Sequence, residues 1–362
     1  MGRTRAFIKY ALSKQSEELI QNEISTLRWL KTCKLHTIQI PELITSHKHQ
    51  AVLENIKPEG ITSSAKFSEV HFKALFELFT SSMHTNTVKE TDYWNQIETQ
   101  IQQITNDDAV PYSKNILKNL KRLSGLIQTD AKVILSRSHG DFTPWNMYPQ
   151  GERLFLYDWE LSQAAVPVFH DLFHYIFQSE ILLFHSDFLK IQASIDGIIE
   201  KPYSQRLIEF YHIDIGLNYS LYLLNNISCY LLIYQKQDHL HMQVSWLLKA
   251  WNDALLFQVK NHQQTLNSRQ NFIRDLFTLL SSKKYTLLKH LEENIENLST
   301  ASDIDLLIPK YEIDSVVKFA RSHPLAKRAK LRQKSYMSTL EIYLNGGEFL
   351  SIDLVTRFLR KT

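Results

Sequence analysis

"SRSHGDFTPWNMYPQGERLFLYDWE", residues 136–160, places three polar side chains in an order that phosphoryl transfer would need. Asp141 and Asn146 stand five positions apart in a segment that is broken by Pro144. Asp158 then ends the apolar run RLFLY, which is typical of a strand. Transfer of a γ-phosphoryl group needs a carboxylate near the acceptor hydroxyl and oxygen ligands that hold magnesium against the nucleotide phosphates. The segment is therefore either a catalytic loop with metal ligands or a turn in which Asp141 caps the next few residues.

The segment belongs to a longer pattern, because HGDFTPWN and LYDWE are followed by VFHDLFHY at residues 168–175. This pattern resembles the aminoglycoside phosphotransferase and choline kinase superfamily, relatives of the protein kinases, over roughly residues 1–260. The resemblance implies that Asp141 acts as the base. It also implies that Asn146 and Asp158 bind Mg²⁺ and that Asp171 braces the catalytic loop.

Four neighbours of these residues have a less direct part in the expected chemistry. We expect His139 to support the loop through hydrogen bonds rather than to act chemically, and Trp145 and Trp159 to be packing residues. Glu160 is either a solvated acid at the end of a strand or a neighbour of the metal site.

Upstream, the resemblance implies a strand lysine that grips the α- and β-phosphates of ATP and a helix glutamate that holds this lysine. Lys9 in AFIKYAL and Glu23 in IQNEISTL suit these roles by order and spacing, with chance pairing of two common residues as the alternative. VLENIKP, residues 52–58, resembles the hinge between two lobes. Backbone groups from Glu54 to Ile56 would meet adenine there.

The N-terminus departs from the kinase pattern. Kinase-like folds carry a glycine-rich hairpin over the phosphates before the lysine strand, whereas eight residues precede Lys9 and Gly2 is their only glycine. Either the sequence is a fragment of an active kinase or the protein is a degenerate kinase that has lost its phosphate clamp. The intact set of Asp141, Asn146 and Asp158 favours the fragment.

A second group of acids lies near the C-terminus. TASDIDLLIP places Asp303 and Asp305 on one face of a predicted strand, and FLSIDLVTRF offers Asp353 in a later one. Three such carboxylates could hold two divalent ions for nucleotidyl transfer. This segment resembles the nucleotidyltransferase superfamily over about residues 285–362, although the glycine-serine pair of that family is absent. The alternative is that Asp303 caps a turn and Asp305 is solvated.

The basic segment RSHPLAKRAKLRQKSY, residues 321–336, either contacts a phosphate or forms a solvated face, and the solvated face is favoured. Binding of nucleic acid would need aromatic groups among the basic residues, and only Tyr336 is near. The formal net charge of the chain is +3. We therefore expect no nucleic-acid partner.

The composition is that of a soluble globular protein, with 44% hydrophobic and 22% charged residues. Cys33 and Cys229 lie far apart and belong to no zinc pattern, which fits a reducing cytoplasm. Residues 215–234 nearly match a bilayer span in length, but three asparagines near their centre favour a buried helix and no membrane span.

These patterns predict an α+β chain with a bilobal protein-kinase-like fold and a small α/β nucleotidyltransferase-like domain. The expected boundaries are a partial N-lobe at 1–58, a helical C-lobe at 59–262, a linker or helix at 263–284 and the last domain at 285–362. Residues 66–135 are expected to be mainly helical. The polar run at 262–270 marks the linker.

The expected function is phosphorylation, with ATP and Mg²⁺, of a hydroxyl group on a small molecule such as a sugar or an alcohol. An aminoglycoside drug is less expected as acceptor, because a polycation needs an acidic pocket and residues 179–200 are mostly apolar. The alternative is a non-catalytic nucleotide-binding or regulatory protein built from degenerate kinase and transferase folds. The pattern specifies neither the acceptor nor the oligomeric state.

Overall fold

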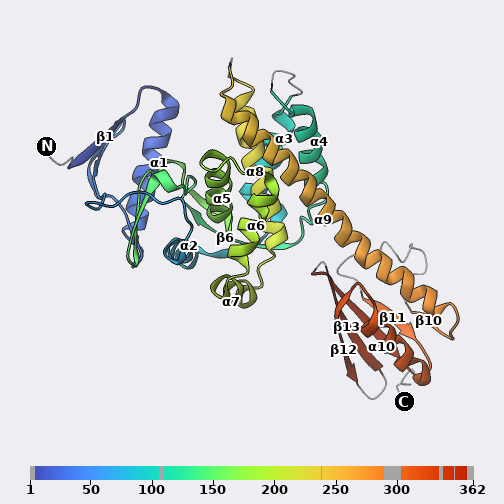
Figure 1. Ribbon diagram of the computed structural model, residues 1–362. Helices are drawn as coiled ribbons and strands as arrows, with labels where there is room; N and C mark the ends of the chain where they lie inside the picture. The colour runs from blue at the N-terminus through green and yellow to red at the C-terminus, as the bar shows by residue number, and fades with distance from the viewer. Residues whose placement is uncertain are drawn as a thin grey trace. The chain divides into compact units, whose positions relative to one another are not determined.

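The computed structural model describes residues 5–105, 110–237, 239–288, 303–333, 337–345 and 347–356. The chain divides into two compact units, Met1–Gln258 and Val259–Thr362. Both units contain helices and strands (Figure 1), so the mixed α and β composition predicted from the sequence is confirmed.

The division between the units lies inside helix α9, Met242–Leu280. The polar run at residues 262–270, expected to be a linker or a helix, is helical. This run contains neither glycine nor proline, and its residues are compatible with a helix.

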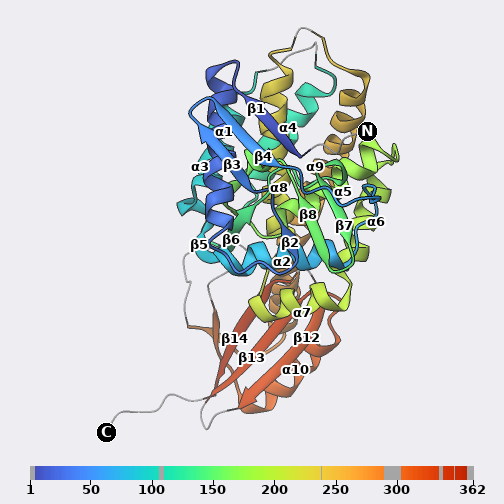
Figure 2. The ribbon, with the colours of Figure 1, turned by 90° about the vertical axis from the view of Figure 1, so that its left-hand side faces the viewer.

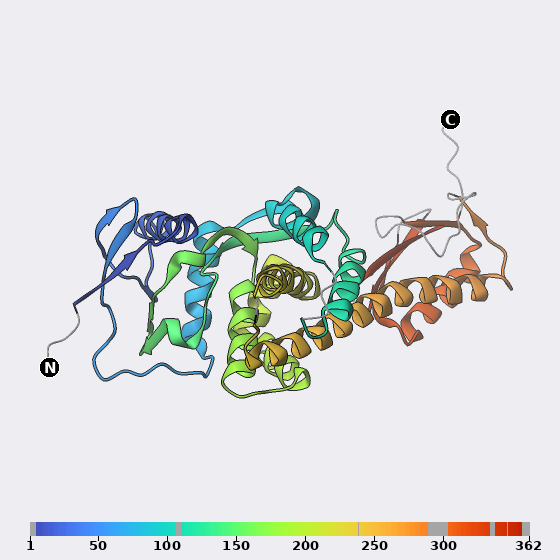
Figure 3. The same cartoon turned by 90° about the horizontal axis from the view of Figure 1, so that it is seen from above.

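The first unit begins with a three-stranded antiparallel sheet of order β1-β4-β3, formed by Ala6–Tyr10, Gln50–Glu54 and Leu43–His47. Helix α1, Lys14–Leu30, follows β1, as predicted, and starts at Ser13, whose side chain accepts a hydrogen bond from the backbone N–H of Ser16. Ile20 and Ile24 of α1 pack on Ala51 of β4. Figure 2 and Figure 3 show α1 alongside this sheet.

Two further sheets carry the segment at residues 136–160. One has the order β5-β6-β9, and the other has the order β2-β8-β7. Their strands are β5 His84–Thr87, β6 Lys132–Ser138, β9 Gln163–Pro167, β2 Ile38–Gln39, β8 Arg153–Leu156 and β7 Met147–Gln150. Strands β5 and β6 interrupt a region that the sequence predicted as mainly helical. The short apolar run of β6 is compatible with either structure, and pairing on both of its edges makes it a strand.

The remaining helices form the larger part of the first unit. Their bounds are α2 Glu69–Ser82, α3 Asp92–Gln103, α4 Ser113–Ser124, α5 His170–Leu182, α6 Phe188–Ile199, α7 Pro202–Tyr211 and α8 Ile215–Tyr234, with short 3₁₀ turns η1 Val88–Glu90, η2 Pro144–Asn146 and η3 Trp159–Leu161. Helix α8 contacts α3, α4 and α5, and Asn218, Asn225 and Asn226 are buried in it. The buried helix predicted at 215–234 is thus confirmed. None of the helices in the described residues is long and apolar enough to cross a membrane.

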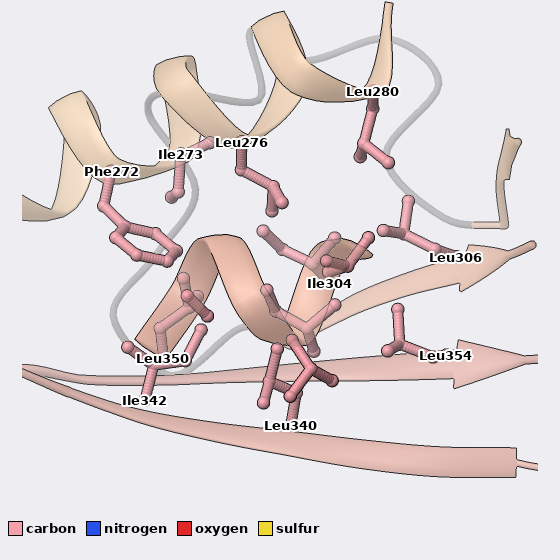
Figure 4. Packing of buried hydrophobic residues seen from close by; sticks show 14 of the residues in the cluster. Phe272, Ile273, Leu276, Leu280, Ile304, Leu306, Leu340, Ile342, Leu350 and Leu354 are labelled. Carbon is pink, nitrogen blue, oxygen red and sulfur yellow. The ribbon is translucent and has the colours of Figure 1, made fainter. Parts of the chain in front are cut away.

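The second unit is a five-stranded sheet covered by helices. Its strand order is β10-β11-β14-β13-β12, and the elements are β10 Thr286–Leu287, β11 Ile304–Leu307, η5 Lys310–Glu312, α10 Ile313–Ser322, β12 Ala326–Gln333, β13 Met337–Leu344 and β14 Phe349–Val355. Residues of α9, including Phe272 and Leu276, pack against Ile304 and Leu340 of the sheet (Figure 4). Strands β13 and β14 pair as an antiparallel hairpin, and Gly346 of its turn lies outside the described residues.

Helix α9 ends at Leu280, directly before Ser281 and Ser282. The hydroxyl groups of Ser281 and Ser282 donate to the carbonyl groups of Thr278 and Leu279, at 2.7 and 3.0 Å. Such local bonds compete with the continuation of a helix.

Candidate active site

The loop at residues 139–146 leaves the buried end of β6 in a conformation that depends on Gly140. The φ of Gly140 is +87°, and a Cβ at this position would lie 2.0 Å from the backbone oxygen of Leu161. A side chain is excluded both by the backbone conformation and by this contact. The glycine therefore allows the loop to approach η3, the turn that follows Asp158.

Asp171, in the first turn of α5, holds the start of this loop. Its carboxylate accepts hydrogen bonds from the backbone N–H groups of His139, at 2.6 Å, and of Gly140, at 3.1 Å. Asp171 is 4% exposed. Burial raises the pKa of Asp171, but its bonds and charge interactions with His170 and His139 lower it by more, so it remains an acceptor for both amides. The expected bracing contact between Asp171 and the loop is present.

His139 is completely buried and connects the loop to the strand that carries Asp158. Its Nδ1 accepts from the backbone N–H of Asp141 at 3.3 Å, so Nε2 carries the proton that is donated to the carbonyl of Tyr157 at 2.7 Å. Burial lowers the pKa of His139. Both ring nitrogens are thus engaged in backbone bonds, which matches the expectation of a supporting rather than a chemical part.

Asp141 and Asn146 are in direct contact. The Nδ2 group of Asn146 donates to Oδ2 of Asp141 at 2.7 Å and to the carbonyl of Asp141 at 3.0 Å. Asn146 also ends η2, where its N–H bonds the carbonyl of Thr143 at 3.0 Å. Within the described residues the amide oxygen of Asn146 accepts no hydrogen bond, so it remains available as a metal ligand.

The β7–β8 hairpin brings Asp158 back beside this loop. Its turn contains Gly151 with a φ of +59°, and at its open end the N–H of Tyr157 donates to the carbonyl of Asn146 at 2.9 Å. Strand β8 ends at Leu156, so Asp158 lies beyond the strand that was predicted to contain it. Its φ of +62° turns the chain into η3. Strand pairing stops here because a left-handed residue departs from the extended backbone.

Lys9, in β1, is surrounded by three carboxylates from two distant segments. Its Nζ lies 2.8 Å from Glu23 of α1, 2.9 Å from Glu160 and in close contact with Asp158. Glu23 also accepts from the N–H of Trp159 at 3.2 Å. The structure thus brings together the lysine and glutamate that were paired from the sequence. Glu160, whose part was left open, belongs to the same cluster.

The charges of this cluster do not balance. One ammonium group meets the three carboxylates of Glu23, Asp158 and Glu160. Burial raises the pKa of Glu23, and Lys9 opposes this effect. For Lys9, burial lowers the pKa, but the charges and hydrogen bonds of Glu23 and Asp158 raise it by more. A cluster with a surplus of carboxylates favours an additional cation.

These residues fit a magnesium ion by the chemistry of their ligand atoms. Oxygen atoms of Glu23, Asp158 and Glu160 lie within 4.8 Å of one another, and no other group of three His, Cys, Asp or Glu side chains in the described part of the chain does so. Magnesium prefers carboxylate and amide oxygens. Asp158 and the free amide oxygen of Asn146 meet that preference.

The predicted hinge follows β4 directly. The N–H of Glu54 donates to the carbonyl of Glu42, and the N–H of Asn55 donates to the carbonyl of Arg5. Within the described residues the backbone of Ile56 makes no hydrogen bond. Of the two residues predicted to meet adenine, Ile56 has the free backbone groups and Glu54 has its N–H engaged.

One residue beside Asp141 was not predicted from the sequence. Nε2 of His174, in α5, lies 3.3 Å from Oδ1 of Asp141, and His174 is 2% exposed. Burial raises the pKa of Asp141, but the contacts with His174, His139 and Asn146 lower it by more. The sequence contained a signal for His174, because this residue follows Asp171 by three positions and so lies on the same face of a helix.

The acids of the second unit are arranged differently. Asp305 and Asp353 are register neighbours on the parallel strands β11 and β14, and Asp353 accepts from the hydroxyl of Thr339 at 2.8 Å. Asp303 is exposed and precedes β11. The oxygen atoms of Asp303, Asp305 and Asp353 do not come within 4.8 Å of one another. Their part in metal binding stays a prediction.

The basic segment after α10 forms β12, which lies at one edge of the sheet. Lys327, Arg328 and Lys330 are exposed, and Arg332 pairs with Glu341 at 2.8 Å. Charged residues on an edge strand discourage pairing with other chains. Tyr336 lies outside the described residues.

Neither the known family models nor the curated proteins contain a match for this chain. Among solved structures, it is similar to aminoglycoside phosphotransferases and choline kinases. The choline kinase LicA from Streptococcus pneumoniae has 19% identity and a TM-score of 0.41, covering 72% of this chain and 88% of that one. The aminoglycoside phosphotransferase APH(2'')-Ib, solved with ADP, has 17% identity and a TM-score of 0.39, covering 69% and 88%. Likenesses of this degree carry no weight for the activity, which has to be inferred from the residues themselves.

Proposed function

We propose that the first unit is a phosphotransferase that uses ATP and Mg²⁺ to phosphorylate a hydroxyl group of a small molecule. The observation that carries the proposal is that two clusters of polar side chains meet at the open end of the β7–β8 hairpin. One cluster contains Asp141 and Asn146, and the other is the group of carboxylates around Lys9. The bond between Tyr157 and Asn146 joins the Asp141 loop to the segment whose Asp158 contacts Lys9. A base, metal-ligating oxygens and a phosphate-binding cation are the parts that this transfer requires.

The nucleotide would be bound by residues of both clusters and by the predicted hinge at residues 52–58. The free backbone of Ile56 would meet adenine, together with the remaining carbonyl group of Glu54. Lys9 would bind the α- and β-phosphates, while Glu23 keeps its ammonium group in place. Asn146 and Asp158 would hold Mg²⁺, which neutralises charge on the phosphates when bound.

The transfer itself would be assisted by Asp141. The acceptor oxygen forms a bond to the γ-phosphorus, and the bond from this phosphorus to the bridging oxygen of ADP breaks. The hydroxyl proton passes to the carboxylate of Asp141, whose lowered pKa keeps it ionised at neutral pH. His139 and Asp171 fix the loop backbone and take no proton.

A neutral polyhydroxyl compound, such as a sugar or an alcohol, is the proposed acceptor. A polycation would need free carboxylates, and residues 179–200 supply few of them. Glu180 is already engaged by Ser194 at 2.7 Å, by Ser186 and by Lys190 at 3.8 Å. A cytoplasmic location, where ATP and Mg²⁺ are abundant, belongs to this proposal.

Thermal unfolding of the full chain with ATP tests the proposal. A ligand that binds only the folded state raises its stability, by about 2.7 kcal/mol at a hundred times the dissociation constant. We expect a rise with ATP and Mg²⁺ that shrinks when Mg²⁺ is removed or when Asp158→Ala is introduced. Ser46→Ala, a change at a half-buried position of β3 whose hydroxyl accepts a hydrogen bond from Arg28, serves as the control. If ATP produces no magnesium-dependent rise, the non-catalytic alternative is favoured.

For the second unit we propose nucleotidyl transfer, because Asp305 and Asp353 are neighbours on parallel strands. Asp303 would complete the set when a divalent ion draws the three carboxylates together. Binding of Mn²⁺ to the full chain, followed by calorimetry, tests this step. Asp305→Asn and Asp353→Asn should each remove one binding event that Asp158→Ala leaves in place; equal binding in all variants contradicts the proposal.

A further inference from the structure

Helix α5 contacts the catalytic loop at two points on one of its faces. Asp171, in its first turn, bonds the backbone of the loop, and His174, three positions later, contacts the side chain of Asp141. Side chains three apart on a helix are neighbours on its surface. One rigid element therefore controls both the path of the loop and the orientation of its carboxylate.

The two carboxylate oxygens of Asp141 have different partners on different elements. Oδ1 faces Nε2 of His174 at 3.3 Å, and Oδ2 accepts from Nδ2 of Asn146 at 2.7 Å. The terminal torsion of an aspartate is broad, so a single contact leaves the plane of the carboxylate free to rotate. Two donors on separate oxygens define that plane.

The surroundings of His174 indicate how its ring is protonated. Nδ1 of His174 is buried and has no hydrogen-bond partner among the described residues. A buried N–H without a partner costs more than a buried lone pair, particularly if the ring is charged. These contacts place the ring proton on Nε2, from which it is donated to Asp141.

The ring of His174 is also held in place by its neighbours. It lies parallel to the ring of His170, with centroids 6.4 Å apart and an interplanar angle of 10°. The ring of Tyr222 on α8 meets both histidines edge-on, at 5.2 Å from His170 and 6.4 Å from His174. A donor that is packed in this way keeps a constant direction.

We propose that His174 is a positioning residue that orients the carboxylate of Asp141 toward the acceptor hydroxyl through a hydrogen bond from Nε2. This inference rests on the proposed function, in which Asp141 is the base. His174 itself neither touches the acceptor nor accepts the proton. Its contribution is to keep one oxygen of Asp141 in the direction in which proton transfer occurs, because small errors in this geometry slow the reaction strongly.

The test uses the full chain, with water as the phosphoryl acceptor, and measures magnesium-dependent hydrolysis of ATP. His174→Met removes the donor but keeps a buried apolar side chain, and His174→Gln keeps an N–H group at a similar distance from the helix. Gln178→Met, a buried polar-to-apolar change one turn later in α5, is the matched control. Thermal unfolding of each variant is followed in parallel.

We expect His174→Met to lower kcat about tenfold to a hundredfold with little change in the KM for ATP. His174→Gln should recover a substantial part of this loss, and Gln178→Met should retain the kcat of the original chain. Equal kcat values for His174→Met and the original chain overturn the inference. The inference is also overturned if His174→Met and His174→Gln lose kcat equally and this loss accompanies a loss of thermal stability.

The proposed function and the inference about His174 are contradicted by different results. If the original chain shows no magnesium-dependent turnover of ATP, the proposed function fails and the inference fails with it. If the original chain turns over ATP and Asp141→Asn abolishes this while His174→Met does not slow it, only the part of His174 is refuted.

Discussion

The acids of the two units are arranged by different kinds of contact. In the first unit Asp141, Asp158 and Asp171 each have a specific partner from a distant segment. In the second unit Asp305 and Asp353 are register neighbours on parallel strands, Asp353 accepts a hydrogen bond from Thr339, and Asp303 is exposed. Partners that order each carboxylate individually are what a site needs before its ligand arrives. All three acids of the first unit meet this condition, whereas in the second unit Asp303 is exposed.

The largest expected effect concerns Asp141, the proposed base. Asp141→Asn preserves the shape of the side chain but cannot take the hydroxyl proton, so ATP turnover should fall by about 10²–10⁴-fold. The thermal shift caused by ATP and Mg²⁺ should persist, because Asn146 and Asp158 are unchanged. Turnover is measured by release of ADP. If the variant instead loses the thermal shift, Asp141 belongs to the nucleotide or metal site and is not the base.

The next effect concerns the charged cluster. Lys9→Met leaves Glu23 buried without its ammonium partner, and loss of one member of such a pair costs about 3–5 kcal/mol. The lower part of this range is expected, because the Lys9 side chain is 28% exposed. Urea unfolding measures the change. Lys14→Met is the control, since its ion pair with Glu18 is exposed and spans 3.9 Å. Similar stability losses for both variants would contradict the claim that Lys9 stabilises the fold as the ammonium partner of buried Glu23.

A pH effect should arise in the first unit from His71 in α2. Burial lowers the pKa of His71 to about 4 from an ordinary value of 6.5. The unfolded chain therefore binds more protons, so this contribution to stability is complete above pH 6.5 and is lost as pH falls through about 4. The difference corresponds to at most about 3 kcal/mol. His71→Phe, which keeps an aromatic ring beside Tyr175, should reduce the loss of stability between pH 6.5 and 4; an unchanged slope argues against His71 as its source.

The second unit should respond to pH with the opposite sign. Burial raises the pKa of Glu348 to about 7, and Arg269 opposes this only in part. The folded chain binds more protons here, so the contribution is complete below about pH 4.5 and is lost as pH rises through about 7. Glu348→Gln should flatten this part of the pH profile of unfolding. A profile that keeps its slope in the variant refutes the assignment.

The smallest expected effect tests whether the two sites are separate. Asp305→Asn should leave the thermal shift with ATP and Mg²⁺ within about 0.5 kcal/mol of the original, because the residues proposed for the kinase site all belong to the first unit. The same unfolding assay measures it, with Asp158→Ala as the contrasting variant. Loss of the shift in Asp305→Asn would show that the acids of the second unit also bind the nucleotide.

Much of the candidate site was predictable because it lies in one short stretch. The order of Asp141, Asn146 and Asp158 within residues 136–160 indicated a loop, a turn and a strand, and the structure has these elements in that order. Asp158 itself was placed in the strand, whereas its left-handed backbone starts the next turn. Backbone angles of single residues depend on the contacts around them, which a local pattern does not contain.

Two other regions depend on contacts that the local sequence does not contain. Residues 262–270 were expected to be a linker or a helix because they are polar, and helix α9 continues through them. Strands β5 and β6 were missed in a region dominated by helical periodicity. In each case packing or pairing with distant segments decided between structures that the local sequence allowed.

The sequence by itself determined the local features of the candidate site: a glycine where the loop needs a positive φ, and the proposed base and proposed metal ligands in their order. Only the tertiary structure decided which of these groups meet. Lys9 contacts Asp158 across 149 positions, and His174 contacts Asp141 across 33. Such contacts depend on how sheets and helices pack, because side chains far apart in the chain are brought together only when a common core buries the elements that carry them.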